Sequence, residues 1–223
     1  GYKGLVEGRI FPYERHSVTN ILNYGGTVLG SARLPEFAKD EVASIARDQL
    51  NNRGIDALVA IGGDGTYKGA MKLAKMGITC VGIPGTIDND IASSDYTIGF
   101  DTALSTVVDA VDKLRDTSSS HHRCSIVEVM GNRCGDLAIW AGIACGAEIV
   151  ITSSTGFEEG EVLERLRDLD LIKKKKHAIV VVTEKLVDVH KLAKTKEERE
   201  EKDRSSSGLY QDSDRKDRGL ILK

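Results

Sequence analysis

Long apolar runs and prolines are scarce in this sequence, and each scarcity excludes a class of protein. Only 3 of the 223 residues are proline, which argues against an extended linker protein. No apolar run approaches the roughly 18 residues that a membrane-spanning helix needs. The first residues lack the basic-then-apolar pattern of a signal peptide. We therefore expect a cytoplasmic protein that has no membrane partner.

The chain also has no surplus of positive charge. Its 31 basic and 34 acidic residues give a net charge of −3, which argues against a nucleic-acid partner. The cysteines form no CxxC pair and lie in or beside apolar segments; they are Cys80, Cys124, Cys134 and Cys145. We expect them to be reduced and mostly buried, because their spacing gives little support to a zinc site.

Glycine, by contrast, is abundant, and its 23 residues punctuate a regular alternation of apolar patterns. Short apolar runs predict buried strands at residues 55–61, 78–83, 126–130, 149–152 and 178–183. Apolar residues at three- and four-residue steps predict helices at 36–52, 70–73, 100–115, 137–144 and 162–171. This alternation predicts an α/β fold, with helices on both faces of a parallel sheet.

A glycine-rich segment, Gly62-Gly63-Asp64-Gly65-Thr66, follows the first predicted strand, and ligands of parallel sheets bind beyond such strand ends. Glycines let backbone N–H groups approach phosphate oxygens, and the helix start behind them favours an anion. Asp64 could face a magnesium ion. The alternative is a plain turn in which Asp64 caps the helix. By itself the motif resembles that of NAD kinases and of diacylglycerol kinases, so it indicates a site for nucleotide phosphates but no particular substrate.

Carboxylates follow two other predicted strands, and a glycine-flanked turn follows a third. Asp88 and Asp90 lie two residues apart after the second strand, which suits one as a base and the other as a metal ligand; the alternative is a polar Asx turn. The third strand ends at Met130 in a glycine-flanked turn, and Glu184 follows the fifth. Arg123 precedes the third strand, so it could share a site with Met130 only from a neighbouring subunit or by a bent approach; otherwise it is a surface charge.

Together, GGDGT, PGTIDNDI, DYTIGFDTALSTVVDAVDKLRDTSSSHHR, VEVMGNRCGDLA and KKHAIVVVTE resemble the bacterial-type ATP-dependent 6-phosphofructokinases over about residues 1–184. The resemblance implies a two-lobed α/β fold, with a nucleotide-binding lobe at 1–100 and a sugar-phosphate lobe at 101–190. The density of charged residues after Lys191 predicts instead a charged, disordered tail at 191–223. The resemblance implies a homotetramer. It also implies a glycolytic enzyme that transfers a phosphoryl group from ATP, with Mg²⁺, to the 1-hydroxyl of fructose 6-phosphate.

The resemblance also assigns roles to residues. Asp88 would be the general base, Thr86 would contact the transferred phosphate, and Arg33 would stabilise the transition state. The ATP phosphates would contact Arg33, Leu34, Gly63, Asp64, Gly65 and Thr66, and Asp64 and Asp90 would hold the magnesium ion. Fructose 6-phosphate would contact Thr86, Asp88, Asp90, Met130, Gly131, Glu184 and, from an adjacent subunit, Arg123. Gly65 and Gly85 resemble the residues of ATP users rather than pyrophosphate users. ADP or phosphoenolpyruvate would bind as effector at Arg115, Glu148, Lys175, Lys176 and His177. Lys175 and Lys176 belong to a lysine run at 173–176, for which the alternative is a solvated loop.

The sequence departs from the family pattern in three places. It begins after the family's GGDxxGxN loop, it carries Asn132 where the family has an arginine, and nothing after Glu184 matches the family's GHxQRGG segment. We therefore expect both lobes to be incomplete, and the missing parts argue against turnover by this chain alone. Two other hypotheses stay open: a non-catalytic nucleotide- or effector-binding subunit, and a different GGDGT kinase that acts on NAD or a lipid.

Overall fold

The computed structural model describes residues 1–154, 158–171 and 174–186, which belong to two compact units. The first unit comprises residues 1–56, and its helices are α1 (Tyr2–Val6), η1 (Arg15–Val18), η2 (Pro35–Ala38) and α2 (Asp40–Asn51). Helix α2 packs against α1 and buries Ala43, Ala46 and Leu50. The Tyr2 ring stacks on Phe37 with centroids 4.4 Å apart. Helix α2 agrees with the sequence pattern, whereas α1 has too few residues to produce one.

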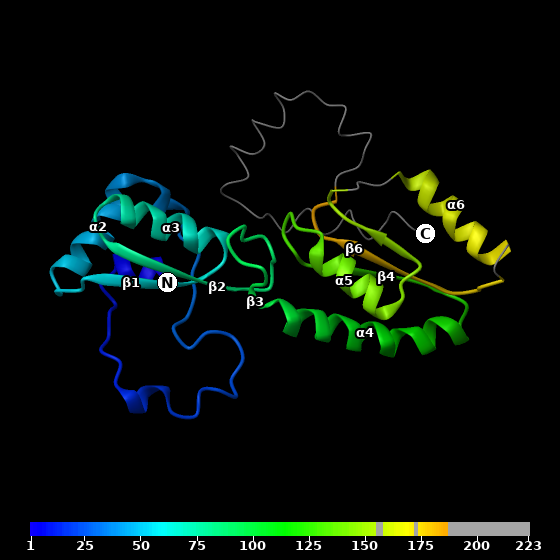
Figure 1. Cartoon of the computed structure of the whole chain (residues 1–223), viewed down its shortest axis with the longest axis horizontal. Helices are drawn as coiled ribbons and strands as arrows, with labels where there is room; N and C mark the ends of the chain where they lie inside the picture. Colours follow the sequence, from blue (N-terminus) through cyan, green and yellow to red (C-terminus); the bar gives the residue numbers. More distant parts are fainter. Residues whose placement is uncertain (155–157, 172–173, 187–223) are drawn as a thin grey trace, which may run out of the picture. The chain divides into compact units, whose positions relative to one another are not determined.

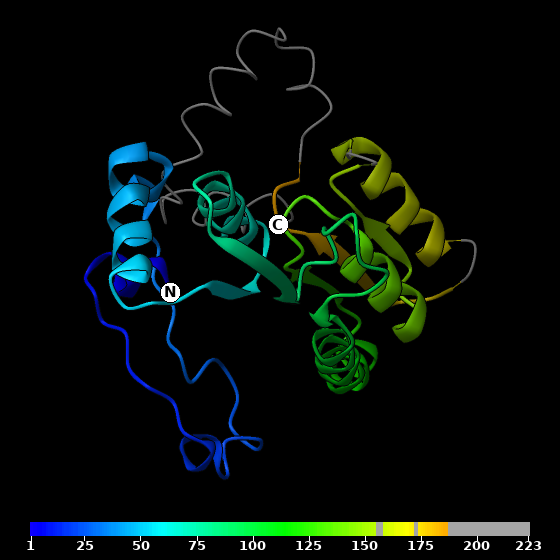
Figure 2. The ribbon, with the colours of Figure 1, turned by 60° about the vertical axis from the view of Figure 1, so that its left-hand side comes forward.

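The second unit begins with a three-stranded parallel sheet. Its elements are β1 (Ala57–Gly62), α3 (Asp64–Lys75), β2 (Thr79–Thr86) and the two-residue strand β3 (Ile98–Gly99), in the sheet order β1-β2-β3. Helix α3 lies along one face of β1 and β2 (Figure 2), where Ala60 and Leu73 are buried. On the alternate positions, Val59, Ile61 and Val81 are between 55% and 57% exposed.

A second three-stranded parallel sheet follows in the same unit. Its elements are α4 (Phe100–Ser120), β4 (Cys124–Val129), α5 (Asp136–Cys145), β5 (Ile149–Ile151), α6 (Glu159–Leu171) and β6 (Ala178–Thr183), and its strand order is β4-β6-β5. Helices α4 and α5 lie on one face of this sheet and α6 on the other (Figure 1).

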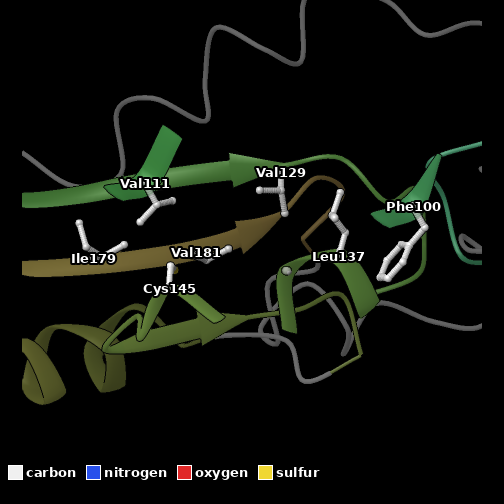
Figure 3. Packing of buried hydrophobic residues seen from close by; sticks show 8 residues of the cluster. Phe100, Val111, Val129, Leu137, Cys145, Ile179 and Val181 are labelled. Carbon is white, nitrogen blue, oxygen red and sulfur yellow. The ribbon is translucent and has the colours of Figure 1, made fainter. Parts of the chain in front are cut away.

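The central position of β6 in the sheet explains why the sequence of this strand is an unbroken apolar run. Ile179 and Val181 point to the α4–α5 face, where they pack with Val111 and Leu137 (Figure 3). Val180, on the alternate side, packs with Val162 of α6 in a separate cluster. A strand covered on both faces cannot alternate apolar and polar residues.

The α/β fold class is confirmed, with helices on both faces of the second parallel sheet, and all the strands that the sequence predicts are present. The expectation that the strands at 55–61 and 78–83 are buried is wrong for one face of the first sheet, where Val59, Ile61 and Val81 are exposed. The cysteines are free, as expected, but the expectation that most are buried is wrong: only Cys145 is buried, and Cys124 is exposed because it opens the edge strand β4. No helix in the described ranges has the length and hydropathy to cross a bilayer. Lys173 and the predicted tail at 191–223 lie outside the described residues.

Candidate functional site

The GGDGT segment is the turn between β1 and α3. Gly63 is the N-cap of α3 and Asp64 its first residue, so Asp64 does not cap the helix; it pairs instead with Lys68 at 2.7 Å. A β-carbon at Gly62 would collide with Thr66 Oγ1, so only glycine fits there. A β-carbon at Gly65 would meet nothing within 4 Å. The turn therefore presents the first backbone N–H groups of α3 beside an open space.

The loop after β2 lies directly beside this turn. Parallel pairing sets Gly62 against Pro84, and a β-carbon on Gly63 would be 3.3 Å from Thr86 Oγ1. Thr86 Oγ1 accepts a hydrogen bond of 3.2 Å from the Asp88 N–H. The predicted phosphate turn and the predicted base are thus held at the same edge of the sheet.

Two loops of the second sheet meet this edge. Pairing of Val129 with Thr183 brings the end of β4 beside the end of β6. The Asn132 N–H then donates to Glu184 Oε1 at 2.8 Å, and Asn132 Nδ2 donates to Asp90 Oδ2 at 3.0 Å. The Asn132 side-chain oxygen accepts a hydrogen bond from Lys185 Nζ. One asparagine therefore joins the loop after β2 to the loops after β4 and β6.

The backbone of these loops is unusual in ways that fit the sequence. Gly131 has φ 141°, and a β-carbon there would lie 2.7 Å from the Cys134 carbonyl oxygen. Asn132 has φ 54° and Lys185 φ 57°, both in the left-handed region. Asparagine enters this region more readily than arginine does. The local backbone thus favours the asparagine that stands where the family has an arginine.

Asp88 is the acid of the site that has a buried side-chain oxygen, Oδ1, without a hydrogen bond among the described residues. Burial raises the pKa of the Asp88 carboxyl above its ordinary value, and the carboxylates of Asp90 and Glu184 raise it further. The Lys185 ammonium acts in the opposite direction on this pKa. A buried carboxylate oxygen without a partner can accept a proton from a substrate hydroxyl.

The chemistry of the donors at this edge suits a magnesium ion that also binds phosphates. Asp64 is exposed at the start of α3, and Asp90 is half-buried in the neighbouring loop. In nucleotide enzymes Mg²⁺ is held by one or two carboxylates together with the substrate phosphates. Within the described ranges, no group of three or more His, Cys, Asp or Glu side chains is arranged to hold a metal alone.

Met130 directly follows β4 at this edge, and it is 58% exposed. Three other predicted residues lie elsewhere. Arg123 directly precedes β4 and donates its N–H to Ser118, so it lies at the end of the strand opposite Met130, as the sequence predicts. Arg33 and Leu34 belong to the first unit, just before η2. Their role at the phosphates stays a prediction.

The predicted effector residues gather at the other end of the second sheet. Glu148 accepts hydrogen bonds from Lys175 Nζ and, at 2.6 Å, from the Ile179 N–H. Burial would raise the pKa of Glu148, but these hydrogen bonds outweigh it, so the pKa is lowered. Arg115 donates to the Cys145 carbonyl at the end of α5.

A basic surface pocket of about 450 Å³ adjoins these residues. It is lined by Ser119, His122, Lys174, Lys175, Lys176 and His177. Sequence reasoning does not single out Ser119 and His122, although both fall in the segment TSSSHHR that carries part of the family resemblance. Sequence reasoning also does not assign a role to Asn89 or Lys185. Asn89 lies between Asp88 and Asp90, to which the motif draws attention, and Lys185 follows the last segment that resembles the family.

Comparison with known proteins identifies the family of the chain. The chain matches the family model described as phosphofructokinase over residues 1–212. Over 194 residues, 87% of the chain, it is 56% identical to the ATP-dependent 6-phosphofructokinase of Vibrio campbellii and 58% identical to that of Aliivibrio salmonicida. The chain spans about 60% of the length of these curated relatives. It also resembles the solved phosphofructokinase of Saccharomyces cerevisiae, with a TM-score of 0.72 and 33% identity over 85% of this chain and 29% of that one.

Proposed function

Since the chain belongs to the phosphofructokinase family, we propose that it transfers a phosphoryl group from MgATP to the 1-hydroxyl of fructose 6-phosphate, a step of glycolysis. The observation that carries the proposal is Asp88 Oδ1, which is buried and has no hydrogen-bond partner among the described residues. Glycolysis would place the protein in the cytoplasm.

Asp88 is the group that we propose as general base. Its main chain is fixed by the hydrogen bond to Thr86 Oγ1, and its free oxygen faces no competing donor among the described residues. It can therefore take the proton of the attacking hydroxyl as the phosphoryl group arrives. Thr86 would contact the transferred group from the same loop.

ATP is proposed to bind with its phosphates against the turn at Gly63–Thr66. The N-terminus of α3 presents backbone N–H groups, and a phosphate there is stabilised by the helix dipole. The open space at Gly65 leaves room for the nucleotide. Arg33 and Leu34 would complete the phosphate contacts, and the arginine would stabilise transition-state charge.

Asp64 and Asp90 are the carboxylates that would hold Mg²⁺. When bound, the ion neutralises charge on the phosphates. Asn132 keeps Asp90 oriented through its 3.0 Å hydrogen bond, and Asp64 is held by Lys68.

The sugar phosphate is proposed to lie against Met130, Gly131 and Glu184, which line the ends of β4 and β6. Since Arg123 lies at the opposite end of β4, its predicted contact would come from another subunit of a homotetramer. The lobe boundaries at 1–100 and 101–190 likewise remain a prediction.

An effector function for the basic pocket is proposed beside the catalytic one. A cluster of lysines and histidines suits the phosphates of ADP or the anionic groups of phosphoenolpyruvate. Lys175, Lys176 and His177 line the pocket, and Arg115 and Glu148 are the further residues that we assign to the effector site. The pocket also keeps open the alternative that this chain binds nucleotide or effector without turnover.

A coupled assay with fructose 6-phosphate and MgATP, run on the full chain, tests the proposal. Asp88→Asn should reduce kcat by about 10²- to 10⁴-fold. Asp109→Asn is the matched control, because Asp109 is exposed on α4, where it pairs with Lys113. Equal activity of wild type and Asp88→Asn would exclude Asp88 as the base.

Binding and substrate profiling separate the alternatives. ATP or ADP binding by calorimetry without turnover would favour a non-catalytic subunit. Phosphorylation of NAD or diacylglycerol instead of the sugar would favour another GGDGT kinase.

A further inference from the structure

In the sequence, Asn89 lies between the proposed base Asp88 and the proposed metal ligand Asp90, yet its side chain bonds to neither of them. Its Nδ2 atom donates to Asp136 Oδ2 at 2.9 Å and to the Asp95 carbonyl at 3.4 Å. Its Oδ1 atom accepts the Thr97 N–H at 3.2 Å. A side-chain amide has two N–H donors and one carbonyl oxygen, so both donors and one acceptor position are occupied. Asn89 therefore has little capacity left for a substrate.

The main chain of Asp88 is held from both sides, because its N–H bonds to Thr86 and its carbonyl accepts a hydrogen bond from Thr97. Thr97, which is 4% exposed, donates its hydroxyl to the Asp88 carbonyl at 3.1 Å while its N–H binds Asn89. Because the Asp88 Oδ1 atom has no hydrogen bond of its own among the described residues, the main chain must hold that carboxylate in place. Thr86, Asn89 and Thr97 supply that support.

Asp136, the partner of Asn89, follows a strand of the other sheet. Asp136 is the first residue of α5, which follows β4, whereas Asn89 follows β2. A second contact joins the same loops, since Cys134 Sγ donates to the Asn89 carbonyl at 3.4 Å. We call the hydrogen bond between Asn89 and Asp136 the clasp; it connects positions 47 residues apart.

We propose that Asn89 is a positioning residue, which holds Asp88 in its reactive place by clasping Asp136 across the two sheets. The inference rests on the proposed phosphoryl transfer. A small misplacement of a reacting group costs about 100-fold in rate. Loss of the clasp should accordingly lower kcat and leave the KM for ATP within about threefold, because the Asn89 side chain is already bonded to Asp136, Asp95 and Thr97.

Exchanging the two partners gives a sharp test. Asn89→Asp keeps an oxygen for the Thr97 N–H but sets two carboxylates against each other, so kcat should fall by about 10- to 100-fold. Asp136→Asn alone keeps an acceptor for Asn89 Nδ2 and should lower kcat by no more than about threefold. The double variant restores one donor and one acceptor in reversed direction, and it should recover kcat to within about threefold of Asp136→Asn. A double variant as slow as Asn89→Asp would overturn the proposal.

An NMR readout keeps the clasp testable whatever the activity. The Asp88 and Thr97 backbone amide signals should move in Asn89→Asp and return in the double variant. If the wild-type chain transfers no phosphoryl group, the proposed function fails, while return of these signals still supports the positioning of Asp88. Signals that do not move in Asn89→Asp, or do not return in the double variant, contradict the positioning role even where catalysis is present.

Discussion

Asn132 and Asp90 are joined by a hydrogen bond of 3.0 Å, although they follow strands of different sheets. The asparagine that forms this bond has φ 54°. A side chain with a functional contact thus stands on a backbone that most residues avoid.

Substitutions at Asn132 should separate the backbone effect from the side-chain effect. Asn132→Gly and Asn132→Ala both remove the contact with Asp90, but only alanine opposes the left-handed backbone. We expect Asn132→Ala to have a free energy of unfolding about 1 kcal/mol lower than Asn132→Gly. Urea unfolding measures the difference, and equal values would show that the left-handed backbone carries no strain.

Lys185 should matter to catalysis through Asn132. Its ammonium donates to the Asn132 side-chain oxygen, so Lys185→Met leaves that oxygen without this donor and loosens the amide that holds Asp90. We expect a fall in kcat of about 10-fold, since a hydrogen bond to a charged group contributes about 1.5–3 kcal/mol. Lys185→Arg keeps a charged donor and is the control; steady-state kinetics with equal kcat for Met and Arg variants would contradict the link.

Two of the three glycines of the GGDGT turn, Gly62 and Gly65, should respond oppositely to alanine. Gly62→Ala places a methyl group in collision with Thr66 Oγ1, and we expect a loss of about 1–3 kcal/mol in the free energy of unfolding. Gly65→Ala meets open space inside a helix and should gain about 0.5–1 kcal/mol. If the nucleotide uses that space, Gly65→Ala also raises the KM for ATP. Thermal or urea unfolding together with ATP titration distinguishes these effects.

Glu148 should make the stability of the second unit depend on pH. Its pKa is lowered in the folded state, so the ionised form stabilises the fold above the ordinary value of 4.5, and this contribution is lost as the pH falls through the folded value. Glu148→Gln should cost about 1–2 kcal/mol at pH 7, and the difference from wild type should shrink in acid.

Urea unfolding at neutral and acidic pH checks this expectation. Glu161→Gln is the control, because Glu161 is exposed on α6 and its pair with Arg165 contributes less than about 1 kcal/mol. A deficit of Glu148→Gln that is the same at both pH values would be incompatible with a lowered pKa.

Local pattern is sufficient for most of the fold. The apolar run at 178–183 predicts β6 with its observed bounds, because a strand buried on both faces leaves a continuous apolar signature. The helix expected at 100–115 continues to Ser120, since Ser118 is buried and bonds Ser125, a contact that periodicity does not reveal. The strand β3 has two residues and no detectable pattern.

The site is predictable in its motifs but not in its connections. Strand ends identify Asp64, Asp88 and Glu184, because parallel strands present their carboxyl ends at one edge. The bonds of Asn132 to Asp90 and of Asn89 to Asp136 join loops more than 40 residues apart, and no local periodicity encodes them. The left-handed backbone of Lys185 is equally invisible in sequence.

Helix α5 carries the sole tryptophan of the chain, Trp140, whose side chain is about half exposed. It stands four residues after Asp136, one helical turn from the clasp. The fluorescence emission of indole depends on contact with water, so Trp140 is a built-in optical reporter one helical turn after Asp136. Movement of the Met130–Asp136 loop on ligand binding can therefore be followed by intrinsic fluorescence, without any attached dye.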